Sequence, residues 1–280
     1  GKSLEDALVP SETEKADGIV TYPGENHPTF SLPPADPGKL RIVHSSCRKP
    51  HGGDRDALPA VDTMIGSTVK EADHRPHQLF LTGDQIYADD VSDTLLKHIQ
   101  NISPIIVGHD ETFETKAGSK TTQDFPPGER TEVAEEDCGF TSGYARSHLF
   151  GLAEYYTMYL LVWSNVLWTD LAAPEEVLPE TFETAKRTID RFVEGEYRYI
   201  EGEFDFVEGW VDDKKKINQI SIELRKENDR WERAQFRRAV YHLTDVAEER
   251  SKLVEFQKDI KRVRRALANV PTYMVFDDRE

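Results

Sequence analysis

Apolar residues along the chain fall into three short runs and several longer periodic stretches. The short runs lie in residues 40–47, 79–90 and 271–278, and each contains consecutive apolar side chains before it turns polar. Short apolar runs of this kind are typical of buried strands. The pattern therefore predicts three strands, each of which ends directly in polar or charged side chains.

A helix is predicted after each of the first two strands. Residues 56–69 carry an apolar stripe at helical spacing, and residues 90–99 read as a second helix. The stripe of the first helix consists of Leu58, Val61, Ile65 and Val69. Because a strand–helix–strand unit crosses over to pair its strands in parallel, the expected fold class is α/β.

Beyond these elements the chain alternates between loop-like and helical composition. Residues 100–143 contain repeated proline and glycine and predict a long loop, whereas residues 144–168 are apolar and aromatic and predict a buried helix. Residues 181–268 are charged and helical, and they end in an apolar stripe of Leu253, Phe256, Ile260, Val263 and Leu267. We therefore expect a large helical insertion over about 144–268, between the second and third strands.

The expected domain organisation is simple. Residues 1–39 are rich in proline and predict an extended lead-in, ahead of one domain that spans 40–280. The apolar stripe of the insertion can fold back on the sheet or mediate a homo-oligomer, and the sequence leaves both open.

Composition and charge limit the classes of partner and compartment that the sequence favours. A net charge of −17 argues against nucleic-acid binding through a general basic surface, because phosphates would be repelled. No stretch approaches the roughly 20 apolar residues of a membrane-spanning helix. Two cysteines are too few for a disulfide scaffold and fit a reducing compartment. The sequence begins at Gly1 without an apolar signal region, which favours the cytoplasm and leaves open a targeting segment already removed.

Side chains with ligand chemistry follow all three predicted strands. Asp84 stands at the carboxyl end of the second strand, where open α/β sheets bind their ligands. Cys47 follows the first strand, and Asp277 and Asp278 follow the third. Carboxylate oxygens suit hard cations, while thiolate and phenolate suit a stronger Lewis acid such as Fe³⁺ or Zn²⁺. The mixture suggests two unlike metals sharing a bridging carboxylate, an arrangement that serves phosphoester displacement.

Three motifs make this expectation more specific. They read Ser45-Ser-Cys-Arg-Lys-Pro50, Gly83-Asp-Gln-Ile-Tyr-Ala-Asp-Asp90 and Val275-Phe-Asp-Asp-Arg-Glu280. In this order they resemble the motifs of PhoD-like metallophosphatases, the alkaline phosphatase D family of the calcineurin-like metallophosphoesterase superfamily. Val162-Trp-Ser-Asn-Val-Leu-Trp168 is similar to a segment in one branch of that family. The resemblance implies a partial metallophosphoesterase-type sandwich and a phosphatase or phosphodiesterase activity.

The resemblance also implies metal ligands. Cys47 and Tyr87 would bind an iron-type ion, and Asp84 would bridge that ion to a second metal such as calcium. Asp278 would bind from the third motif, with Asp277 less favoured at that position. The expected cofactors are therefore iron and calcium, or another divalent metal pair.

Two residues are expected to act on the substrate, which is a phosphoester. Asp84 would hold the metals against it, and Arg48, next to the motif cysteine, would face its phosphate. As the family implies, a metal-activated water would attack phosphorus in line.

Two departures from the family pattern favour an alternative function. Arg279 occupies the position of the third motif's histidine, and a fixed cation neither shuttles protons nor ligates metals. The sequence also ends at Glu280, within or just after this motif, so we expect an N-terminal portion truncated at its C-terminus. The chain is therefore expected to be a phosphoester hydrolase or an inactive N-terminal fragment of one. The alternative is a degenerate, non-catalytic member that binds protein through its helical insertion.

Each site residue also has an ordinary interpretation. Asp84 after glycine fits a simple turn, and Cys47 at a strand end fits a small buried apolar residue. Tyr87 fits a residue that caps the core. Asp89 and Asp90 fit the N-cap and first turn of the following helix better than a metal site.

Overall fold

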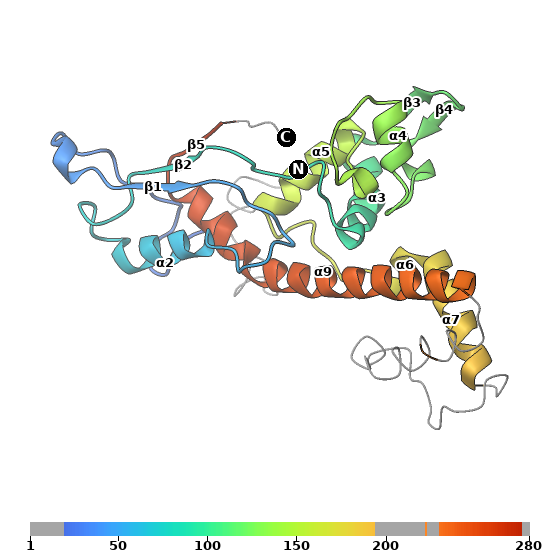
Figure 1. The fold of residues 1–280 in the computed structure, drawn as a ribbon. Coiled ribbons are helices and arrows are strands. Elements are labelled where there is room, and N and C mark those ends of the chain that lie inside the picture. Colours follow the sequence, from blue (N-terminus) through green and yellow to red (C-terminus); the bar gives the residue numbers. More distant parts are fainter. Residues whose placement is uncertain (1–19, 194–221, 223–229, 276–280) are drawn as a thin grey trace.

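The computed structural model describes residues 20–193, 222 and 230–275 of the chain, and all structural statements refer to these residues. The helices and strands are drawn in Figure 1. In chain order they are η1 (Pro37–Lys39), β1 (Ile42–Ser45), α2 (Pro59–Thr68), β2 (Gln78–Leu81), α3 (Asp93–Val107), β3 (Thr112–Thr115), β4 (Gly118–Thr121), η2 (Thr122–Asp124), α4 (Thr131–Glu136), η3 (Ala145–Ser147), α5 (Leu152–Trp163), α6 (Pro174–Val177), α7 (Pro179–Val193), α9 (Arg230–Ala268) and β5 (Thr272–Met274).

The three predicted strands form one parallel sheet in the order β1-β2-β5. Val43 pairs with Leu79 in the first ladder, and Phe80 pairs with Tyr273 in the second. The mixed α/β class and the parallel pairing are confirmed. Since the strands run parallel, their carboxyl ends lie at one edge of the sheet, and the polar residues that follow them start from that edge.

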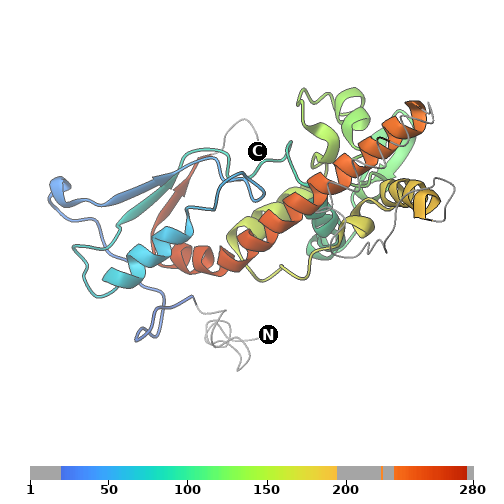
Figure 2. The same ribbon diagram turned by 60° about the horizontal axis from the view of Figure 1, so that its bottom comes forward.

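Helices α2 and α9 cover one face of this sheet, as Figure 2 shows. Leu79 on β2 and Ile65 on α2 are fully buried in the core between them. Burial of each such side chain contributes about 1.5–3 kcal/mol. The opposite face keeps Ile42 and Tyr273 exposed, so the described residues cover the sheet on one side only.

Helix α9 is the longest described element, with 39 residues, and extends about 58 Å at 1.5 Å per residue. Its apolar stripe is confirmed, because Leu253, Phe256, Ile260 and Val263 are all buried. Asp62 on α2 accepts two hydrogen bonds of 2.7 Å from Arg265, which fixes the end of α9 against α2. All described helices from α3 to α9 lie between β2 and β5 in the chain, although these strands are neighbours in the sheet.

The prediction of a long loop over 100–143 is wrong. Helix α3 continues to Val107, and the hairpin β3–β4 and helix α4 follow it. Pro104 lies inside α3 and leaves the carbonyl of Gln100 without its usual helical partner. Gln123 donates to this carbonyl at 2.8 Å, so a residue from the following turn satisfies the interrupted helix.

The start of α3 also differs from the expectation. Ser92 is the N-cap, and its hydroxyl accepts from the backbone N–H of Leu95 at 3.2 Å. The helix therefore begins at Asp93 rather than at 90, and neither Asp89 nor Asp90 caps it.

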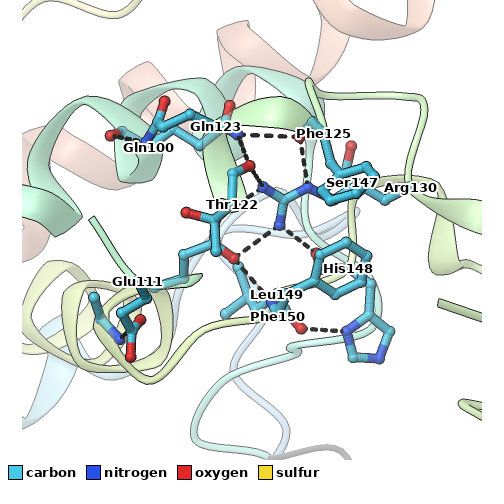
Figure 3. Close-up of polar contacts among 12 residues, drawn as sticks. Gln100, Glu111, Thr122, Gln123, Phe125, Arg130, Ser147, His148, Leu149 and Phe150 are labelled. Atoms are coloured by element: carbon cyan, nitrogen blue, oxygen red, sulfur yellow. Dashed lines mark hydrogen bonds and ion pairs between the residues drawn. The ribbon is translucent and has the colours of Figure 1, made fainter. Parts of the chain in front are cut away.

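A buried arginine ties the segments after α3 together (Figure 3). Arg130 donates to both carboxylate oxygens of Glu154 at 2.8 Å, and both side chains are fully buried. The same guanidinium donates to backbone carbonyls of Thr122, Phe125 and His148. Every edge of the guanidinium is thus matched by an acceptor, which a buried cation requires.

Candidate metal centre at the carboxyl ends of the strands

Two loops leave the carboxyl ends of β1 and β2 and meet each other. Cys47 in the first loop has φ of 58° and Asp84 in the second has φ of 44°, the two positive values at non-glycine residues in the described part of the chain. Each left-handed residue costs about 1–2 kcal/mol relative to the ordinary backbone. The Cys47 N–H donates to the carbonyl of Gly83, and the Arg48 N–H to that of Asp84, both at 3.0 Å. These bonds hold the two strained residues side by side.

The Asp84 carboxylate is buried and only partly satisfied. Its Oδ2 accepts from the Tyr87 hydroxyl at 2.9 Å. Its Oδ1 is buried and has no hydrogen-bond partner among the described residues. Leaving a buried acceptor unpaired costs about 1–3 kcal/mol. A hydrogen-bond donor or a cation at this oxygen would therefore stabilise the fold.

Cys47 and Tyr87 complete a group of three donors with Asp84. Cys47 is an exposed free thiol, 3.1 Å from the hydroxyl of Ser46. Burial raises the pKa of Tyr87, and hydrogen bonds of its hydroxyl with Asp84 and Cys47 raise this pKa further. The tyrosine hydroxyl thus contacts both other side chains, and the structure brings these three predicted ligands together.

The donor chemistry of this group fits a metal ion. Sulfur, phenol and carboxylate oxygen together suit a Lewis-acidic ion of the Fe³⁺ or Zn²⁺ type. Within the described ranges no three histidine, cysteine, aspartate or glutamate side chains are grouped to hold a metal, so the candidate depends on Tyr87 as the third donor.

All of the third predicted motif except Val275 lies outside the described residues. Asp277, Asp278 and Arg279 belong to this undescribed stretch. The strand before it is placed, since the Val275 N–H donates to the Leu81 carbonyl at 2.9 Å. The described chain therefore leads toward the edge of the sheet that carries Asp84.

Arg48 has structural partners. Its Nε and Nη2 donate to Oδ2 of Asp56 at 3.0 and 2.7 Å, and its Nη1 donates to the carbonyl of Val162. Its guanidinium also lies 4.5 Å from the ring centre of Phe256 on α9. Burial lowers the pKa of Arg48, and Asp56 opposes this shift. The contacts join the Cys47 loop to α5 and α9, and none of them involves the group of three donors.

Sequence reasoning missed a second connection between the loops. Lys49 and His51, just beyond Cys47, both contact the carboxylate of Asp90, which follows Tyr87 by three residues. Burial opposes the ionisation of Asp90, but the hydrogen bonds from His51 and Lys49 outweigh it and hold its pKa at about 2. The sequence offers no local signal for this contact, because its partners lie about forty residues apart.

Two pockets flank the Cys47 loop. One, of about 270 Å³, is lined by residues 45–49 and 52–58, including Cys47. The other, also about 270 Å³, lies between this loop and α9, with Lys252 and Phe256 in its wall. The exposed thiol of Cys47 therefore borders a pocket of small-molecule size.

Two further observations bear on the class of protein. In the part of the chain that the structure describes, each helix is too short or too polar to cross a membrane, in line with the sequence prediction. Comparison of the chain with protein-family models, with curated proteins and with solved structures finds no match. The site itself and the three motifs are therefore the features that bear on function.

Proposed function

We propose that the chain is a metal-dependent phosphoester hydrolase, or the N-terminal portion of one, of the PhoD-like type. In this proposal the parallel sheet belongs to a metallophosphoesterase-type sandwich, and the helices between β2 and β5 form its insertion. Two facts support it: the order of the three motifs, and the convergence of Cys47, Asp84 and Tyr87.

The Asp84 carboxylate carries most of the argument. It is buried, held in a left-handed backbone, and leaves Oδ1 unpaired among the described residues. Strain and an unsatisfied acceptor at one residue are costs that a fold retains where function requires them. A cation at Oδ1 would compensate both.

Each candidate ligand has a separate role in the proposed metal site. Cys47 and Tyr87 would hold an iron-type ion, Asp84 would bridge it to a calcium-type ion, and Asp278 would complete the second site. When bound, such metals supply Lewis acidity and an activated water for attack on phosphorus. Tyr87 would give up its hydroxyl proton, which now lies on the hydrogen bond to Asp84, because a ligating oxygen must be deprotonated.

Arg48 has a different task in this proposal from the one that the motif implies. Its guanidinium is buried and paired with Asp56, so it would fix the loop that carries Cys47 instead of meeting the phosphate. Charge neutralisation at the phosphate would then come from the metals.

The direct test is hydrolysis of p-nitrophenyl phosphate and bis(p-nitrophenyl) phosphate by the iron- and calcium-loaded chain. Asp84→Asn removes the bridging charge at nearly constant shape and should abolish turnover of both. Asp110→Asn, at an exposed aspartate between α3 and β3 and outside both pockets beside Cys47, is the matched control and should retain it. Equal turnover by Asp84→Asn and wild type would refute the proposal.

The alternative, a non-catalytic module that binds protein through its insertion, has one supporting observation. Helices α7 and α9 enclose a shallow pocket of about 300 Å³ lined by residues such as Arg238 and His242, and Trp231 and Tyr241 on α9 are 72% and 63% exposed. Exposed aromatic side chains often mark protein interfaces. Absence of metal together with a stable complex through α9 would favour this function, and light scattering of the purified chain would decide whether the partner is a second copy.

A further inference from the structure

One carboxylate, that of Asp90, links the two loops that carry the proposed metal ligands. Its contacts with Lys49 and His51 are called the tie below. Asp90 belongs to the loop of Asp84 and Tyr87, and it receives Lys49 and His51 from the loop of Cys47. The Lys49 ammonium contacts Oδ2, and His51 Nε2 lies 3.5 Å from Oδ1. Each carboxylate oxygen thus holds one side chain of the opposite loop.

The three side chains of the tie are partly or almost fully buried, and ion pairs are stronger there than at a fully exposed surface. The side chain of Asp90 is 24% exposed, that of Lys49 29% and that of His51 5%. Charge-assisted hydrogen bonds between partly buried groups exceed neutral ones in strength. Removing one partner would leave the others poorly solvated.

Besides this tie, two backbone hydrogen bonds join the loops, donated by Cys47 and Arg48 to the carbonyls of Gly83 and Asp84. The described residues also show a long 3.5 Å hydrogen bond from the Ser46 hydroxyl to the Gly83 carbonyl and the contact of the Tyr87 hydroxyl with Cys47. Two of these residues are left-handed, and a strained backbone persists only where its surroundings over-determine it. The strained pair therefore needs several constraints, and Asp90 is placed to supply one through charged side chains of both loops.

Asp90 has no other structural task that accounts for these contacts. Ser92 caps α3, and Asp93 is the first helical residue, held by Ser147 at 2.6 Å and by Arg146. The neighbouring Asp89 accepts from Ser142 at 2.9 Å, outside the tie. The position and contacts of Asp90 point across to the Cys47 loop instead.

We propose that Asp90 is a positioning residue that holds Cys47 in register with Asp84 and Tyr87 through Lys49 and His51. The purpose of this register, a preformed metal site, depends on the function proposed above. The register itself is a property of the metal-free chain and can be measured without metal.

Hydrogen exchange of the Cys47 and Arg48 amides in the metal-free chain is the first test, because these amides form the backbone bonds between the loops. Asp90→Asn should speed their exchange at least about tenfold, since a hydrogen bond to a charged group contributes more than one factor of ten to the local opening equilibrium. Asp110→Asn removes the same charge from an exposed site outside the two loops and should leave both rates unchanged.

Iron affinity is the second test. Residues that orient metal ligands typically change affinity 10- to 100-fold when replaced, so Asp90→Asn should weaken iron binding by about this factor. Should Asp90→Asn fail to fold, Lys49→Gln replaces it. That variant keeps the Asp90 charge and should speed exchange at the same two amides.

The two proposals fail separately. Unchanged exchange of both amides in a folded Asp90→Asn or Lys49→Gln variant overturns the positioning role, whatever the metal content. Faster exchange with no iron bound by the wild type supports the positioning role and refutes the proposed function. Faster exchange with weakened iron binding supports both.

Discussion

Glu249 on α9 provides a quantitative test of how burial against α9 changes the ionisation of a carboxyl group. Its Oε2 is buried and lacks a hydrogen-bond partner among the described residues. Burial raises its pKa from 4.5 to about 7, helped by the nearby charges of Asp93, Asp245 and Asp90 and opposed by Arg146. The carboxyl is therefore neutral in the folded chain at mildly acidic pH.

The raised pKa fixes the sign of the pH dependence. Between pH 4.5 and about 7 the folded state holds a proton that the unfolded state releases, so the contribution of Glu249 to stability falls over this window and is constant above it. The shift from 4.5 to about 7 sets an upper limit of about 3 kcal/mol, because one pKa unit corresponds to about 1.36 kcal/mol. Partial exposure of the side chain reduces the actual value.

The perturbation is Glu249→Gln, which keeps the shape and removes the titration. Its stability relative to wild type, from urea unfolding, should rise between pH 5 and pH 8 by up to about 3 kcal/mol. Glu248→Gln, at the exposed neighbouring position, is the control and should follow the wild type. A stability difference between Glu249→Gln and wild type that stays constant with pH would refute the reasoning.

Two further predictions concern the fold and the strained loop. Arg130→Met leaves the buried Glu154 charge unpaired and should cost about 3–5 kcal/mol in urea unfolding, whereas Arg55→Met, which removes an exposed guanidinium, should cost far less. Similar losses in the two variants would contradict this. At Cys47 the left-handed backbone should make Cys47→Gly about 1 kcal/mol more stable than Cys47→Ala, although glycine is otherwise the less stable choice. The reverse order in thermal unfolding would show that the strain is absent.

The sequence predicted those parts of the fold that depend on local periodicity. Short apolar runs located β1, β2 and β5, and the helical stripe from Leu253 to Val263 located the buried side of α9. Parallel pairing followed from the helix between the first two strands. These elements are specified by residues close together in the chain, which is why pattern reasoning reaches them.

The incorrect predictions share a physical cause, since each concerns a residue whose structure depends on a partner distant in the sequence. Pro104 reads as a helix breaker, but the side chain of Gln123 satisfies the carbonyl that it frees. Asp90 reads as a residue in the first turn of the following helix, but it precedes that helix, and Lys49 and His51 bind it from the other loop. At the site, the motifs in the sequence identified Cys47, Asp84 and Tyr87 as candidate ligands. The left-handed backbone of Cys47 and Asp84 and the unpaired Oδ1 of Asp84 were visible only in the structure.

The most direct measurement is the iron content of the purified chain after exhaustive dialysis, by plasma mass spectrometry. The account predicts about one iron per chain in the wild type, held by Cys47, Asp84 and Tyr87, and its loss in Cys47→Ala with the fold intact. Cys138→Ala removes the other exposed thiol and should keep the metal. Iron that persists in Cys47→Ala, or a wild-type chain that binds none, would contradict the proposed site.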